Sequence, residues 1–257
     1  MALLADKRAS VRRGKRPLNS RARALAPFPA VRTMRGVPTV LAATRLSRDF
    51  GAVRALRDVS LELASGELAG LAGPSGSGKT TLLHLLAAID TPTGGSVRLL
   101  GREVSALSRG ERAALRLAHV GLVFSEHNLS PALTIAENVE LPMALAGRPA
   151  GERAQRVGAA LAGLGIGELG GRFPEQLSSG QQQRGAVARA LAGEPALLLL
   201  DEPTAHLDSA SAAKLVERVA DLVRERGMAA LLASHDPQVL SRCARVLSLR
   251  DGALEAG

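Results

Sequence analysis

The sequence lacks tryptophan and tyrosine, and it has only four phenylalanines and one cysteine among 257 residues. A hydrophobic core must therefore be built from aliphatic side chains, which the 46% apolar content supplies. The single cysteine, Cys243, excludes a disulfide within the chain and is typical of a reducing compartment. No run of about 18 apolar residues occurs, so the sequence predicts no membrane-spanning helix.

The net charge of +9 belongs to one end of the chain. Residues 1–38 contain ten Lys or Arg residues and one acid, whereas the remainder has 23 basic and 23 acidic residues. We therefore expect no specific nucleic-acid partner for the main part of the chain. Because residues 1–38 are rich in Arg, Ala and Pro without periodicity, we expect a disordered basic tail. Three interpretations stay open: a solvated tail, a tether to anionic lipid or nucleic acid, or an extension upstream of a true start at Met34.

Residues 73–81 carry a complete phosphate-binding pattern. They fit G-x-x-x-x-G-K-[ST], with an apolar run before them and a helical pattern after them. Glycines let the backbone N–H groups approach a phosphate, and the following helix directs its positive end at the same anion. We expect Lys79 to contact the β- and γ-phosphates of a bound nucleotide and the Thr80 hydroxyl to bind Mg²⁺. The expected nucleotide-binding residues of this loop, which the family resemblance described below assigns to ATP, are Gly73, Pro74, Ser75, Gly76, Ser77, Gly78, Lys79, Thr80 and Thr81.

Two acids follow the apolar run at residues 196–200. Carboxylates at the tip of a buried strand are costly unless a cation lies beside them. We expect Asp201 to hold Mg²⁺ through water, and Glu202 to orient or deprotonate an attacking water molecule. The alternative is an ordinary strand end with solvated acids, and the phosphate-binding pattern makes this alternative weak.

Strands alternate with helices along the chain, which predicts an α/β fold with a mostly parallel sheet and helices on its faces. A purely helical segment at about 134–172 is expected as an insertion, with its helices broken by Pro142, Gly147 and Pro149. The expected strands are 39–46, 53–63, 68–72, 97–100, 120–124, 196–200, 228–233 and 244–249. The other expected helices are one ending near Asp90 and those at 109–118, 180–191 and 210–226.

Residues 177–184, Leu-Ser-Ser-Gly-Gln-Gln-Gln-Arg, open a helix that the two serines can cap. Together with the two motifs above, they make the chain resemble the ATP-binding subunit of an ABC transporter over residues 39–252. The resemblance implies a P-loop NTPase core, an antiparallel β subdomain and a helical subdomain at about 134–190 that carries the signature motif. Residues 253–257 are then expected to be a short tail.

The resemblance also implies roles for single residues. The signature residues Ser178, Ser179, Gly180 and Gln181 are expected to act on the ATP of a partner subunit. Asp208 matches the loop that crosses the dimer interface, and His235 matches the histidine that contacts the γ-phosphate. Phe50 stands where the family places an aromatic ring against adenine. The other four histidines receive no role: His84, His119, His127 and His206.

Further motifs are similar to those of the lipoprotein-releasing, macrolide-export and cell-division ATPases. These motifs include Pro92–Val97, Val120–Phe124 and Glu137–Val139. The similarity implies a homodimer, or a pair with a homologous subunit, that closes around two ATP and drives an integral membrane permease from the cytoplasmic face of the membrane. Export or mechanical signalling across the membrane fits this branch, and the cargo is not encoded here. A soluble ABC switch without transport is the alternative, while a P-loop kinase would leave residues 177–184 and His235 unexplained.

Two positions depart from the family pattern. Ser125 stands where the family has a glutamine that touches Mg²⁺ and the attacking water, and it is too short to do so without a bridging water. We keep Ser125 as a further candidate metal contact, with Glu126 as a weaker substitute. Ser179 replaces the first signature glycine, so its side chain either crowds the partner's γ-phosphate or donates a hydrogen bond to it. We expect ATP binding to survive both changes, with slower hydrolysis.

Overall fold

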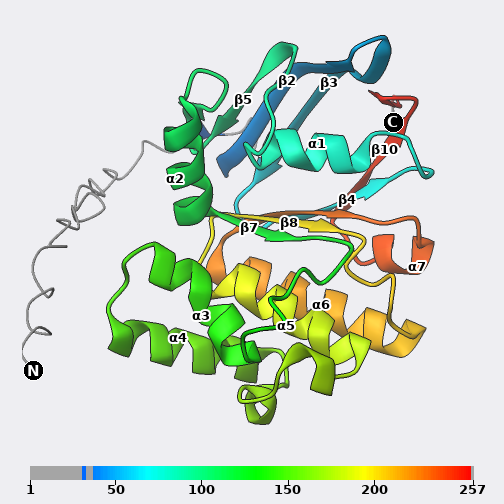
Figure 1. Ribbon diagram of the computed structural model, residues 1–257. Helices are drawn as coiled ribbons and strands as arrows, with labels where there is room; N and C mark the ends of the chain where they lie inside the picture. Colours follow the sequence, from blue (N-terminus) through cyan, green and yellow to red (C-terminus); the bar gives the residue numbers. More distant parts are fainter. Residues whose placement is uncertain (1–30, 33–36, 256–257) are drawn as a thin grey trace, which may run out of the picture.

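The computed structural model describes residues 31–32 and 37–255, and it contains two sheets (Figure 1). The first is a five-stranded antiparallel sheet that includes the long hairpin of β2 and β3. Its strands are β1 (Val31–Arg32), β2 (Pro38–Phe50), β3 (Val53–Ala64), β5 (Gly94–Leu99) and β6 (Arg102–Glu103).

The second sheet has six strands in the order β11-β10-β4-β9-β8-β7. Every neighbouring pair is parallel except the terminal hairpin of β10 and β11. Its strands are β4 (Leu68–Ala72), β7 (Val120–Val123), β8 (Leu197–Asp201), β9 (Ala229–Ala233), β10 (Arg245–Arg250) and β11 (Ala253–Leu254). Parallel strands bring their carboxyl ends to one edge, which is where α/β proteins place their ligands.

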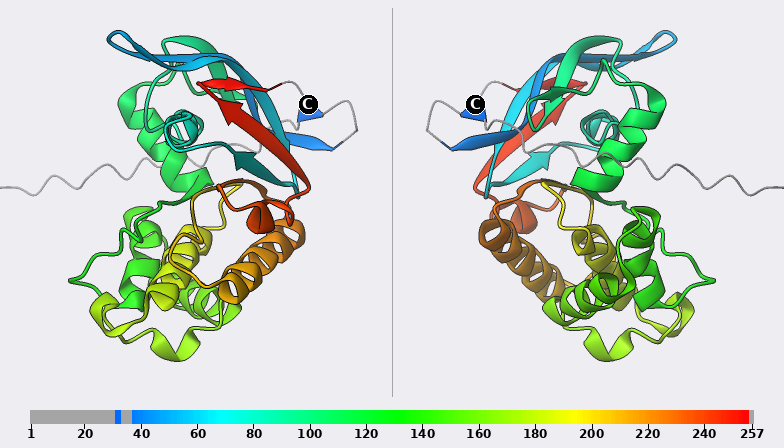
Figure 2. Two further views of the ribbon diagram at one scale, coloured as in Figure 1. Left: turned by 90° about the vertical axis from the view of Figure 1, so that its right-hand side faces the viewer. Right: turned by 90° about the vertical axis from the view of Figure 1, so that its left-hand side faces the viewer.

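Helices cover both faces of the parallel sheet, which explains its apolar strands. α1 (Lys79–Leu86) lies between the two sheets, and α3 (Ile135–Leu145), α4 (Ala150–Gly163), α5 (Ser179–Ala192) and α6 (Ser209–Arg226) lie on the opposite side (Figures 1 and 2). The remaining helices are α2 (Arg109–His119), α7 (Pro237–Leu240) and the short 3₁₀ segments η1 (Gly167–Leu169) and η2 (Pro174–Gln176). Among the described residues, none of these helices is long and apolar enough to cross a bilayer.

The leucines of β8 divide between two cores. Leu197 and Leu199 pack with α1 and the antiparallel sheet, whereas Leu198 and Leu200 pack with the helices of the other face. All four side chains are fully buried, and each contributes about 1.5–3 kcal/mol through the area removed from water. Burial on both faces therefore fixes where the polar end of β8 emerges.

The structure confirms the predicted α/β fold and corrects several details. Pro142 lies inside α3 rather than breaking it; because it stands near the end of the helix, its missing N–H affects only the last turn. Gly147, with φ +72°, and Pro149 do separate α3 from α4. β2 extends to Phe50 because it pairs with β3 as far as Val53.

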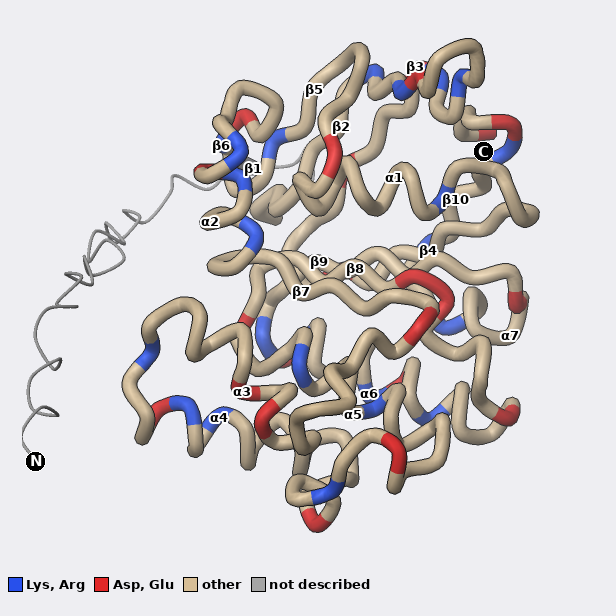
Figure 3. Tube along the Cα trace, in the orientation of Figure 1, with Lys and Arg blue, Asp and Glu red and all other residues tan. Residues whose placement is uncertain are grey.

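Strand pairing continues past both predicted boundaries of the ATPase domain. Ala253 pairs with Arg250 in the hairpin of β10 and β11, so the sheet continues beyond residue 252. At the other end, Val31 pairs with Thr39 and Arg32 with Pro38, because the edge of β2 offers backbone hydrogen bonds. The predicted disorder of the basic tail stays a prediction, since residues 1–30 and 33–36 lie outside the described residues. Over the part that the structure describes, basic and acidic residues are interspersed (Figure 3).

Candidate functional site

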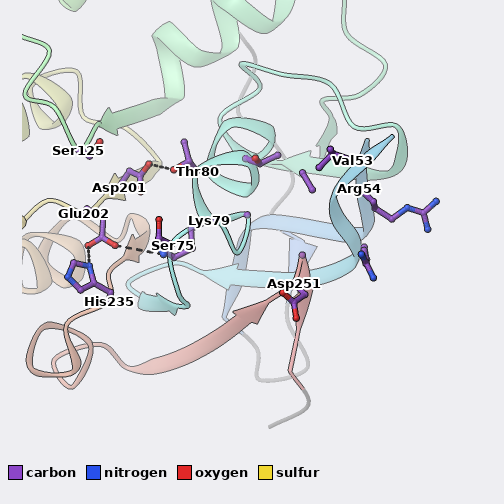
Figure 4. Close-up of a pocket in the computed structure, with 16 residues that line it drawn as sticks. Val53, Arg54, Ser75, Lys79, Thr80, Ser125, Asp201, Glu202, His235 and Asp251 are labelled. Carbon is purple, nitrogen blue, oxygen red and sulfur yellow. Dashed lines mark hydrogen bonds and ion pairs between the residues drawn. The ribbon is translucent and has the colours of Figure 1, made fainter. Parts of the chain in front are cut away.

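A cleft of about 840 Å³ opens beside the amino end of α1, at the carboxyl edge of the parallel sheet (Figure 4). It brings together side chains from β4–α1, β8 and the segment after β9. Ten residues predicted from the sequence line it: Ser75, Gly76, Gly78, Lys79, Thr80, Thr81, Ser125, Asp201, Glu202 and His235. The two acids and the phosphate-binding loop therefore share one site.

The loop before α1 requires glycine where it joins the helix. Gly78 has φ +106°, and a Cβ there would lie 2.8 Å from the carbonyl oxygen of Ala55. Gly78 is also the N-cap of α1 and provides no side-chain hydrogen bond to the helix. The first N–H groups of α1 are therefore not capped by this residue, and this arrangement suits an incoming anion.

The ammonium group of Lys79 lies within this loop and is largely buried, with the residue 8% exposed. Its Nζ donates to the carbonyl oxygens of Gly73, at 2.7 Å, and Pro74, at 3.1 Å. It also lies 3.9 Å from Glu202 Oε1. The site thus holds a positive charge at the amino end of α1, where a phosphate would be attracted to it.

Thr80 and Asp201 form a pair of oxygen ligands. The Thr80 hydroxyl donates to Asp201 Oδ2 at 2.7 Å, and Asp201 is only 7% exposed at the end of β8. A hydroxyl and a carboxylate are hard oxygen donors, which suit Mg²⁺ and leave positions for water and phosphate oxygens. The donor set therefore fits the predicted metal. Ser125 is exposed and lines the same cleft.

Glu202 and His235 meet in the cleft, with Oε2 3.1 Å from Nδ1 (Figure 4). The Glu202 side chain is 18% exposed, whereas that of His235 is 71% exposed. The backbone at Glu202 has φ +46°, and its N–H donates to Ala233 on the neighbouring strand. A mostly buried carboxylate paired with an accessible imidazole is suited to receiving a proton from water in the cleft.

Phe50 is not among the sixteen residues that line this cleft. Its residue is 50% exposed, and the guanidinium of Arg48 lies 4.4 Å from the ring centroid. Arg48 in turn pairs with Asp90 at 2.8 Å. One side of the ring is thus occupied by a cation, and the adenine contact stays a prediction.

The signature residues lie outside the cleft, at the amino end of α5. The Ser178 side chain accepts from the N–H of Gln181, and the Gln181 side chain accepts from the N–H of Ser178, which completes a capping box. Asp208 caps α6 in a similar way: its Oδ1 accepts from the N–H of Ser211 at 2.9 Å. Hydrogen bonds from Ser211 hold the pKa of the Asp208 carboxyl below its ordinary value. None of these residues lines the cleft of its own chain.

One side of the cleft consists of residues that were not predicted from the sequence. The additional lining residues come from the start of β3 and the turn between β10 and β11: Val53, Arg54, Ala55, Arg57, Asp251 and Gly252. Arg54 also pairs with Asp49 at 3.1 Å across the turn between β2 and β3. Both turns contain a glycine with positive φ, Gly51 and Gly252, but no local sequence pattern places the two hairpins beside the phosphate-binding loop.

Known proteins are similar to this chain in sequence and in structure. A sequence profile of the ABC transporter family matches residues 56–205, more than half of the chain. The lipoprotein-releasing system ATP-binding protein LolD 2 of Caulobacter vibrioides is 42% identical over 220 residues, 84% of this chain and 96% of that protein. The macrolide export ATP-binding/permease protein MacB of Rhodopseudomonas palustris is 42% identical over 82% of this chain, but the match spans only 33% of that longer protein.

Among solved structures, the dimeric post-hydrolysis state of the ATP-binding cassette MJ0796, bound to ADP and Pi, is similar. It has a TM-score of 0.79 and 35% identity, covering 84% of this chain and 97% of that chain. The matches in sequence and in structure agree with the motifs in the cleft. The chain therefore belongs to the ABC transporter family, as an ATP-binding ATPase of the LolD and MacB type.

Proposed function

We propose that two copies of this chain close around two ATP molecules, hydrolyse them, and thereby drive a membrane permease carried by a separate chain. One observation in particular supports a site shared between two copies. The cleft holds the phosphate-binding loop and the acids, while the capped serines of the signature lie outside it at the amino end of α5. A second copy can supply that helix end, and the similar cassette MJ0796 is described as dimeric.

Within each site, Lys79 and the amino end of α1 bind the phosphates. Thr80 and Asp201 would hold Mg²⁺, which supplies positive charge opposite the phosphate oxygens. Glu202 accepts a proton from the attacking water, and His235, 3.1 Å away, orients that carboxylate and faces the phosphate that is released. Ser125 occupies the place of a longer side chain and slows hydrolysis, because its hydroxyl needs a bridging water to reach the reacting groups.

The paired site is tested by the ATPase rate per chain at increasing protein concentration. We expect the rate per chain to rise with concentration and then level off as the dimer forms. In parallel, Glu202→Gln with ATP and Mg²⁺ should sediment as a dimer, while Lys79→Ala should remain a monomer. A constant rate per chain from a verified monomer contradicts the paired site.

The permease is proposed from the relatives, since LolD 2 is named as the ATP-binding protein of a lipoprotein-releasing system and MacB as an ATP-binding/permease protein. Export or mechanical signalling across the membrane fits this branch. The chain would then lie on the cytoplasmic face of the membrane, held there by its permease. A pull-down with tagged Glu202→Gln and ATP from membranes of the source cell should recover a membrane protein.

Ser125 favours one alternative, a soluble ABC switch without transport, because the glutamine it replaces reports the nucleotide state to the membrane subunit in related proteins. Recovery of soluble proteins alone, with intact ATP-bound bait, supports this alternative over transport.

A further inference from the structure

Two histidines that received no role from the sequence meet in the structure. The rings of His127, in the loop after β7, and His206, in the loop before α6, lie with centroids 5.5 Å apart at an interplanar angle of 63°. The first loop contains Ser125 and the second contains Glu202, and both of these residues line the nucleotide cleft. The contact therefore joins two segments that carry site residues.

His127 also reaches the signature motif. Its Nε2 lies 3.4 Å from the hydroxyl oxygen of Ser179, the first residue of α5. Ser179 is the position at which this chain departs from the usual glycine. The Ser179 side chain, which stands where the family usually has glycine, thus has a contact partner within its own subunit.

The backbone around His127 is fixed by the same helix. Arg189, further along α5, donates from Nη1 to the carbonyl oxygen of Asn128 at 2.6 Å and from Nη2 to that of His127 at 3.4 Å. Burial lowers the pKa of the His127 imidazole and the neighbouring His206 lowers it further, whereas a hydrogen bond with the Ser179 backbone raises it.

The first turn of α5 has little freedom to move away. A Cβ on Gly180 would lie 3.0 Å from Leu207 Cδ2, so the backbone at Gly180 packs closely against the loop that contains His206. The Ser179 side chain is exposed and can rotate about its Cα–Cβ bond, and a hydroxyl can donate one hydrogen bond while accepting others. The orientation of the Ser179 hydroxyl consequently depends on its contact with His127.

We propose that His127 is a positioning residue for the signature motif: its Nε2–H donates to Ser179 Oγ and leaves the hydroxyl proton free to donate to the γ-phosphate bound by the partner subunit. His206 contacts the His127 ring in an edge-on arrangement. This inference rests on the proposed paired site and explains how the chain accommodates a serine in place of glycine. A side chain oriented before the second copy arrives loses less conformational freedom when the pair closes.

A double-mutant cycle tests the proposal through kcat and KM for ATP. We expect His127→Ala to lower kcat about 5-fold, with KM changed less than kcat, because the hydroxyl loses its orientation. In the Ser179→Gly background, the same substitution should change kcat by less than about 1.5-fold. His127→Gln, whose amide can donate to Ser179, should restore kcat to within about 2-fold of the parent.

His119→Gln is a matched control, since His119 lies at the end of α2 and outside this cluster; it should leave kcat unchanged. Thermal unfolding of each variant shows whether the chain has folded. An equal effect of His127→Ala with serine or glycine at 179 overturns the positioning role and assigns His127 to loop packing alone.

Nitrogen-15 NMR of the histidine side chains tests the contact between His127 and Ser179 independently of whether two copies form the paired site. We expect His127 to carry its proton on Nε2, with a signal that shifts in Ser179→Gly. A His127 proton on Nδ1 contradicts the proposed donor. If the NMR result holds while the ATPase rate per chain does not depend on concentration, the paired site fails and the contact within the subunit survives.

Discussion

The carboxylate of Glu202 lies 3.1 Å from Nδ1 of His235, and the same carboxylate lies 3.9 Å from the ammonium of Lys79. The end of β8, the loop after β9 and the start of α1 therefore meet at Glu202. We therefore predict that Glu202 and His235 act together in hydrolysis rather than independently.

Removing His235 should accordingly cost little once Glu202 is inactive. We expect His235→Ala to lower kcat about 10- to 100-fold, and to lower it by less than about 2-fold in the Glu202→Gln background. Single-turnover hydrolysis of labelled ATP measures the step directly. Losses that multiply in the double variant would show that the two residues work separately.

Lys79→Ala should weaken ATP binding about 10- to 100-fold, because hydrogen bonds to charged groups contribute about 1.5–3 kcal/mol. Titration calorimetry of the variant with ATP measures the loss. Lys214→Ala, on the exposed side of α6, is the matched control and should bind ATP like the parent. Equal binding by all three proteins would contradict the assignment of Lys79.

Asn138 secures the segment that joins the cleft to α3. It is fully buried; its Oδ1 accepts from the N–H of Ser130, and its Nδ2 lies 2.9–3.0 Å from the carbonyl oxygens of Ser130, Leu133 and Thr134. Asn138→Ala leaves these groups without their partner and should lower the free energy of unfolding by about 2–4 kcal/mol. Urea denaturation measures the change, and a loss under about 0.5 kcal/mol would contradict the role given to this side chain.

Two glycines should respond to alanine in opposite directions. Gly95 has φ +79°, and a Cβ there would lie 2.1 Å from the carbonyl oxygen of Arg45, so Gly95→Ala should destabilise the fold by more than about 2 kcal/mol. Gly151 lies in α4 with no atom within 4 Å of its added Cβ, so Gly151→Ala should stabilise by about 0.5–1 kcal/mol. Thermal unfolding of both variants checks the signs.

Burial raises the pKa of the Cys243 thiol to about 11. The reactive thiolate is then about 0.1% populated at pH 8, far below the fraction expected for an ordinary thiol with a pKa of about 8.5. We expect slow reaction with a thiol reagent in the folded protein and rapid reaction in urea. Because the folded pKa is raised, the stability contributed by the protonated thiol is complete below about pH 8.5 and is lost as the pH rises through about 11. Rapid labelling of the native protein at pH 8 would contradict this burial.

Several parts of the fold and the site could be predicted from local sequence. The spacing of glycines before Lys79 predicts the phosphate-binding loop because only glycine permits its backbone angles at positions such as Gly78. The apolar run before Asp201 predicts a buried strand with an acid at its tip, and the structure confirms both. The amino ends of α2 and α5 also follow from local hydrogen bonding, since their N-cap residues Ser108 and Ser178 each complete a capping box.

Tertiary structure alone decided the other features. The proximity of the β3 start and the β10–β11 turn to the cleft, the burial of Lys79 and the contact of His127 with His206 all join segments distant in sequence. Such contacts depend on how the two sheets and the helices pack, and no periodic pattern encodes that packing. The sequence determined the chemistry of this protein through residues that act on their immediate neighbours, whereas its geometry required long-range burial to bring those residues together.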